Sequence, residues 1–88
     1  MKLKENFILQ QVADTWTVLP IGKGVINFDG ILTLNETGVL LWKKLEEEVE
    51  KQALVDALRA EYNVSEEQAL ADIEEFVEKL SLAGCLQA

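Results

Sequence analysis

Histidine does not occur anywhere in this 88-residue sequence. Its absence removes the commonest general base of enzymes and the commonest protein ligand of transition metals. Only one cysteine, Cys85, is present, so the usual four cysteine and histidine ligands of a structural zinc site cannot be assembled. We therefore expect no catalytic residues, no metal site and no cofactor.

Long apolar runs and a disulfide framework are also missing. The longest apolar runs are a few residues, whereas a membrane-spanning helix needs about 20. The basic start at residues 1–5 is not followed by the apolar segment of a signal peptide. A small secreted domain would need several disulfides, and one cysteine cannot supply them. These absences predict a cytoplasmic protein that has no membrane partner.

Basic residues are scarce, because eight Lys and Arg stand against sixteen Asp and Glu, giving a net charge of −8. Nucleic acids and anionic membranes are bound mainly through clustered Lys and Arg, so this balance argues against both as partners. An acidic surface also serves solubility, so the charge excludes partners better than it identifies one. With 49% hydrophobic residues, residues 1–88 are typical of a single soluble domain with one core.

What is present at the front of the chain is β-patterned. Residues 7–12 and 15–19 are rich in β-branched and aromatic side chains, and Ala13-Asp14 between them suits a short hairpin turn. Pro20 cannot donate to a β-ladder, so it ends the second strand or marks an edge.

A second hairpin signal, Asp29-Gly30, lies between residues 25–28 and 31–34. We therefore expect an antiparallel sheet of three to four short strands over residues 7–34.

From Asn35 onward the apolar period changes to about 3.6 residues, which predicts helices. Asn35 is a good N-cap for the first helix, whose apolar stripe is Val39, Trp42, Leu45 and Val49.

A second helical stripe is shifted in phase: Leu54, Val55, Leu58 and Tyr62. We place the break between the two helices in residues 46–50, while one continuous helix over 36–62 remains an alternative. Asn63 is expected to end the second helix, because Asn tolerates the left-handed conformation of a C-terminal cap.

The third helix begins at a capping-box pattern, residues 65–68, and Gly84 is expected to cap its end. The helices thus extend over residues 35–84. One face of the third is apolar (Ala69, Ile73, Phe76, Val77 and Leu80). The other face is acidic, relieved only by Lys79 (Glu66, Glu67, Asp72, Glu74, Glu75 and Glu78).

Strands followed by three helices at this length predict an α+β, winged helix-turn-helix-like domain. Most winged helices bind DNA through the third helix, which needs Lys, Arg or Asn facing a groove. Here that helix presents six carboxylates and only one lysine. The carboxylates would repel the phosphates of DNA. A DNA-binding regulator is therefore only an alternative interpretation.

A family resemblance is carried by three segments in order. Leu34-Asn35-Glu36-Thr37-Gly38 with Trp42 and Leu45 resembles the "LNETxxxIWxLL" segment of PqqD-like proteins. Residues 54–64 resemble the family's "L..eYdv" segment, and residues 72–86 resemble "DvxxFlxxLxxxGLL". The match covers roughly residues 7 to 86.

The resemblance implies a RiPP recognition element: a non-catalytic, winged-helix peptide chaperone. Such domains bind the leader of a ribosomally made precursor and present it to a modifying enzyme, often a radical SAM protein or a leader peptidase. In the family the leader adds as a strand to the last strand of the sheet, beside the third helix. The peptide-binding residues this implies are Ile31, Leu32, Thr33 and Leu34 on the strand, with Asp72, Glu75 and Lys79 as the helix wall.

Three departures from the family pattern shape this interpretation. Residues 48–51 stand where the family has a turn that contains Gly or Thr. Residues 21–30 add an extra hairpin, and Gly84-Cys85-Leu86 stands where the family has "GLL". We therefore expect a stand-alone PqqD-like member rather than a protein of pyrroloquinoline quinone synthesis itself. The docking edge could instead be residues 25–28, and the chain could be a structural subunit of a larger modifying enzyme. Either a monomer or a homodimer is compatible with the sequence.

Overall fold

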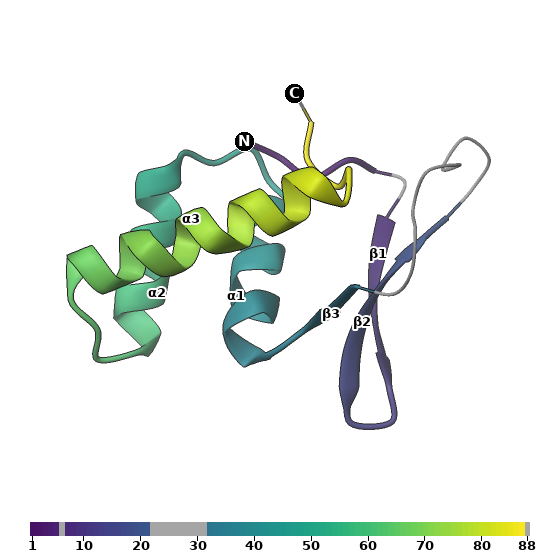
Figure 1. Ribbon diagram of the computed structural model, residues 1–88, viewed down its shortest axis with the longest axis horizontal. Helices are drawn as coiled ribbons and strands as arrows, with labels where there is room; N and C mark the ends of the chain where they lie inside the picture. Colours follow the sequence, from purple (N-terminus) through teal and green to yellow (C-terminus); the bar gives the residue numbers. More distant parts are fainter. Residues whose placement is uncertain (6, 22–31, 88) are drawn as a thin grey trace.

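The computed structural model describes residues 1–5, 7–21 and 32–87. In this part an antiparallel three-stranded sheet is followed by three helices, as the sequence predicts (Figure 1). The strands are β1 (Phe7–Val12), β2 (Thr15–Pro20) and β3 (Leu32–Leu34). The helices are α1 (Glu36–Leu45), α2 (Lys51–Glu61) and α3 (Glu66–Leu82).

The sheet has the order β1-β2-β3, so in the described part of the chain β3 pairs on one side only. Val18 on β2 lies opposite Leu9 on β1 and Leu32 on β3, and these three residues point to the same face. Ala13 makes the β1–β2 turn possible with a φ of 56°. The strand expected at residues 25–28 lies outside the described residues.

The junction between β3 and α1 is capped as predicted. The side-chain oxygen of Asn35 accepts a 2.8 Å hydrogen bond from the backbone N–H of Gly38. A Cβ at Gly38 would stand 3.1 Å from the Cβ of Leu34, closer than most side chains pack. The glycine therefore lets the first turn of α1 lie directly against the end of β3.

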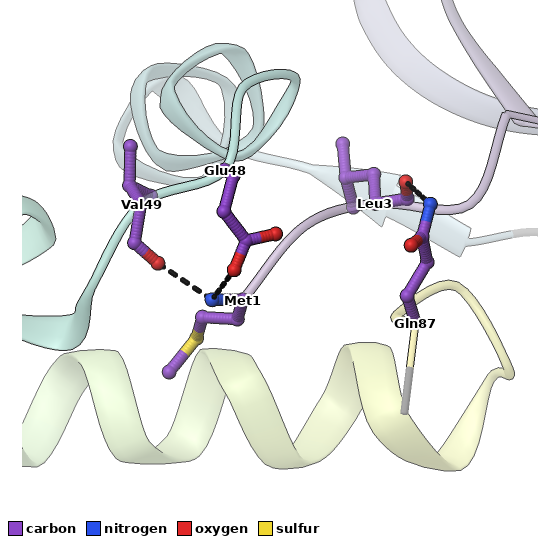
Figure 2. Close-up of polar contacts among 5 residues, drawn as sticks. All are labelled: Met1, Leu3, Glu48, Val49 and Gln87. Carbon is purple, nitrogen blue, oxygen red and sulfur yellow. Dashed lines mark hydrogen bonds and ion pairs between the residues drawn. The ribbon is translucent and has the colours of Figure 1, made fainter.

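The break between α1 and α2 is confirmed, and the alternative of one continuous helix is wrong. Residues 46–50 separate the two helices, and Val49 lies in this connection rather than on α1. The N-terminal ammonium of Met1 donates hydrogen bonds to the Val49 carbonyl at 2.6 Å and to Glu48 Oε1 at 3.1 Å (Figure 2). The bond to Val49 satisfies a backbone carbonyl that a continuous helix would have paired internally.

The ends of α2 and α3 differ in how they are capped. α2 ends at Glu61, and its C-cap Tyr62 is extended with a φ of −128°. Among the described non-glycine residues only Ala13 has a positive φ, so the left-handed cap expected at Asn63 is wrong. At the start of α3 Ser65 caps Gln68 N–H as predicted, with a 3.1 Å hydrogen bond.

The predicted glycine cap of α3 is confirmed at Gly84, whose φ is 77°. Its N–H donates to the Ser81 carbonyl, and the next N–H, of Cys85, donates to the Leu80 carbonyl. This pair of bonds is the Schellman motif, in which a left-handed residue satisfies the last carbonyls of a helix.

Both chain ends run side by side over the helices, as an N-terminal strap (residues 1–5) bonded to residues 85–87. Leu3 N–H donates to the Leu45 carbonyl at 3.0 Å, and Lys4 N–H donates to the Cys85 carbonyl at 2.8 Å. Gln87 closes the arrangement by donating its side-chain amide to the Leu3 carbonyl (Figure 2). The strap therefore ties the C-terminal ends of α1 and α3 together.

Helix α1 lies at the centre of the core, between the sheet and the other helices. Trp42 is 2% exposed, whereas Trp16 on β2 and Phe76 on α3 are only half-buried. The remaining buried apolar side chains come from every element and both chain ends (Leu3, Phe7, Val18, Leu32, Leu34, Val39, Leu41, Leu45, Leu54, Val55, Leu58, Ala69, Ile73, Leu80 and Cys85).

Replacing Asn35 with Ala should lower the free energy of unfolding by about 1 kcal/mol, because the Gly38 N–H loses its cap. Chemical denaturation of both proteins measures the difference. Asn35→Asp keeps the acceptor oxygen and should retain nearly full stability. Equal losses in both variants would show that the cap is not the cause.

The buried Cys85 thiol makes stability depend on alkaline pH. Burial, opposed by the nearby charge of Lys4, raises the pKa of Cys85 from 9.0 to about 11. Below pH 9 the thiol is protonated in both the folded and the unfolded state, so its contribution to the free energy of unfolding is fully present. Between pH 9 and 11 only the unfolded state releases the proton, so stability falls, by at most about 2–3 kcal/mol. Denaturation of Cys85→Ala across this range should show a smaller fall than the unsubstituted protein.

Candidate functional site

A groove lies between β3 and α3, with the first half of α1 as its floor. Its volume is about 500 Å³. Thr33 and Leu34 of β3, together with the cap residue Asn35, form one wall. The floor comes from α1 (Thr37, Gly38 and Leu41), and the opposite wall comes from α3 (Asp72, Glu75, Phe76 and Lys79).

The α3 wall is a single helical face. Asp72, Glu75, Phe76 and Lys79 are spaced at i, i+3, i+4 and i+7, which places them in one stripe along the helix. This stripe adjoins the buried Ile73 and Leu80, so the same helix packs the core and lines the groove. The wall is therefore rigidly placed by core packing.

Lys79 touches the edge of the sheet. Its ammonium group donates a 3.4 Å hydrogen bond to the backbone carbonyl of Thr33. In an antiparallel strand the N–H and C=O of one residue point to the same side. The Thr33 carbonyl is reached from α3, at the edge of β3 that has no described strand beside it, and we infer that the N–H of Thr33 points the same way.

The groove is apolar at the bottom and charged at the rim. Leu34 and Leu41 are buried beneath it, Phe76 is half-buried, and Gly38 adds no side chain. Asp72 accepts a 2.9 Å hydrogen bond from the side chain of Gln68. Such a surface fits an extended chain with an apolar side chain directed inward and polar groups toward the rim.

The structure brings together five of the seven predicted site residues, namely Thr33, Leu34, Asp72, Glu75 and Lys79. Leu32 points into the core, where it is 9% exposed, and it does not line the groove. Ile31 and the alternative docking edge at residues 25–28 lie outside the described residues.

Sequence reasoning misses the floor of the groove. It places Phe76 in the core alone, and it does not single out Leu41, Thr37 or Gly38 as site residues. The spacing of Phe76 from Asp72 and Lys79 is a usable signal, because residues at i, i+4 and i+7 share a helix face. Nothing in the sequence marks Leu41, which looks like any other apolar helix residue.

Two other kinds of site are absent from the described residues. No cluster of three or more His, Cys, Asp or Glu in this part of the chain is arranged to hold a metal ion. None of the described helices combines the length and the apolar character needed to cross a bilayer.

Comparisons with known proteins find one family model and one similar solved structure. The family model described as "Coenzyme PQQ synthesis protein D (PqqD)" matches residues 16–86. Among solved structures, the chain is similar to "TbiB1 in Complex with the TbiA(beta) Leader Peptide", with a TM-score of 0.78 and 25% sequence identity. That alignment covers 100% of this chain and 96% of the other. No curated protein matches this sequence.

Proposed function

This chain belongs to the PqqD family, and we infer that it is a peptide-binding adaptor in the maturation of ribosomally made peptides. It binds the leader of a precursor peptide, as the structurally similar TbiB1 does in its complex with the TbiA(beta) leader peptide. Its role is non-catalytic: it presents the precursor to a separate modifying enzyme of the radical SAM or leader peptidase type. The observation that carries the proposal is the groove at which the edge of β3 meets an apolar floor.

The leader would bind by adding a strand to β3. The outward-facing N–H and C=O of Thr33 supply one pair of backbone hydrogen bonds, and they lie at the groove rim. Lys79 would leave the Thr33 carbonyl when the peptide arrives, at little cost, because its bond is long and exposed. An apolar leader side chain would then rest on Leu41 and Phe76.

The expected affinity is moderate. Four to six backbone hydrogen bonds contribute roughly 0.5–1.5 kcal/mol each, and one or two buried apolar side chains add roughly 1.5–3 kcal/mol each. After the costs of association and ordering, Kd should lie between about micromolar and tens of nanomolar. This range suits an adaptor that must release its cargo after modification.

Thr33→Pro should weaken leader binding several-fold to about tenfold, because proline removes the N–H that faces the groove. The β2 ladder should survive, since that N–H does not point to β2. Thr33→Val keeps the N–H and serves as the matched control. Titrating fluorescent leader peptides encoded beside this chain's gene measures both variants.

Two results would contradict the proposal. The first is an absence of binding of any encoded leader to the unsubstituted protein at tens of micromolar. The second is equal affinity of the Thr33→Pro and Thr33→Val proteins, which would place the peptide elsewhere. Thermal unfolding of both variants shows whether each remains folded.

The charge of the α3 wall predicts the charge of the leader. Asp72 and Glu75 stand on the groove against the single Lys79, so a leader with Lys or Arg at the matching position is favoured. Asp72→Asn combined with Glu75→Gln should lower the affinity for such a leader by about two- to fivefold, the effect expected of losing exposed ion pairs. Glu78→Gln, on the same helix but outside the groove, should have no effect. Isothermal titration at low and high salt measures the difference, which salt should diminish.

A further inference from the structure

A second hollow of about 460 Å³ lies beside the C-terminal half of α1. Its rim carries the side chains of Lys2 and Lys4 from the strap and Lys43 from α1. Apolar side chains of the sheet complete it, namely Phe7, Leu9 and Trp16. We call this hollow the lysine pocket.

The lysine pocket departs from the charge of the whole chain. Three of the eight basic residues meet there, although the chain carries sixteen acids. Two glutamates, Glu5 and Glu46, also line it, yet among the described residues none forms an ion pair with Lys2, Lys4 or Lys43. Within the described part of the domain these three lysines are therefore free of ion pairs, and the side chains that line the pocket carry one more positive than negative charge.

The apolar part of the lysine pocket is accessible. Trp16 is half-buried, and the ammonium group of Lys43 lies 5.6 Å from the centre of its ring. Ile8, which also lines the hollow, is 39% exposed and is one of the few large apolar side chains on the surface. Tryptophan is enriched among the residues that contribute most of the binding energy at protein interfaces.

The wall that carries Lys2 and Lys4 is fixed in place. The backbone of Leu3 bonds to α1, that of Lys4 bonds to Cys85, and the Lys2 carbonyl accepts a 2.9 Å hydrogen bond from the Gln87 N–H. The two lysines are thus held at the pocket rim by the backbone on either side. A partner would meet a preorganised surface, which lowers the entropic cost of binding.

The lysine pocket and the groove lie on opposite faces of α1. With about 3.6 residues per turn, Lys43 and Glu46 point away from Thr37 and Leu41. The groove carries two carboxylates and one lysine, whereas the pocket carries three lysines and two carboxylates. A peptide in the groove therefore leaves the lysine pocket free, and the two surfaces attract ligands of opposite charge.

We propose that the lysine pocket is the docking surface for the modifying enzyme, and that it takes an acidic segment of that enzyme with an apolar side chain among its carboxylates. The carboxylates pair with Lys2, Lys4 and Lys43, and the apolar side chain rests on Trp16 and Ile8. A protein segment fits better than a nucleic acid, because a long polyanion would also meet the acidic remainder of the surface. This proposal rests on the adaptor function, since it supplies the second binding surface that presentation of a leader requires.

Charge reversal at the pocket tests the proposal. The probe is the purified modifying enzyme encoded beside this chain's gene, immobilised for biolayer interferometry. Lys4→Glu combined with Lys43→Glu should weaken its binding at least tenfold, and the unsubstituted interaction should weaken as salt rises. Lys51→Glu combined with Arg59→Glu, on α2, gives the same net charge and should retain the enzyme affinity. Both double variants should bind the leader peptide within twofold of the unsubstituted protein.

Other outcomes would overturn the proposal. Equal weakening of enzyme binding in the two double variants would indicate a general charge effect. If the enzyme did not bind the unsubstituted protein, the lysine pocket would be excluded as its docking surface. Sedimentation that shows a dimer dissociating only in the Lys4→Glu, Lys43→Glu protein would assign the pocket to a second copy of the chain. If the unsubstituted protein did not bind the leader, the adaptor function itself would be contradicted. Failure of the docking proposal and failure of the adaptor function are therefore distinguishable.

Discussion

The junction at Asn35 and Gly38 sets the relation between the sheet and the helices. Asn35 begins α1 immediately after β3, and Gly38 allows the helix to lie against Leu34 without a side chain between them. If the helix started later or stood further away, the apolar surface of α1 would not lie beneath the edge of β3. The groove exists because the edge of β3 and one face of α1 are joined through a single residue, Asn35.

Helix α1 packs the core and also separates the groove from the lysine pocket. Its buried residues, among them Trp42 and Leu45, hold the sheet against α2 and α3. Its two remaining faces line the groove on one side and the lysine pocket on the other. Because the same rigid element supports both surfaces, a ligand on one side is held in a defined orientation relative to a partner on the other. A small adaptor with two such surfaces on one helix can in this way bring two molecules together.

Local signals predicted most of the fold, and long-range contacts account for what they missed. The caps at Asn35, Ser65 and Gly84 were predictable, because each depends on residues within one turn. The break after Leu45 lacked such a signal, since its polar groups are satisfied by Met1, far away in sequence. Likewise the α3 wall followed from helical spacing, whereas the floor at Leu41 depends on how α1 crosses the strand. The lysine pocket joins the strap to α1 and could not be anticipated from either segment alone.

An exposed strand edge invites unwanted pairing with other chains, so a protein that uses one must protect it. In this chain the protection is provided by Lys79, whose charged ammonium group bonds to the carbonyl of Thr33. A lysine discourages a second sheet from approaching, yet its long exposed bond is easily exchanged for that of a specific peptide. The neighbouring Asp72 and Glu75 add two negative charges to the same wall of the groove. The same α3 face can therefore both guard the edge and admit a leader of the right sequence.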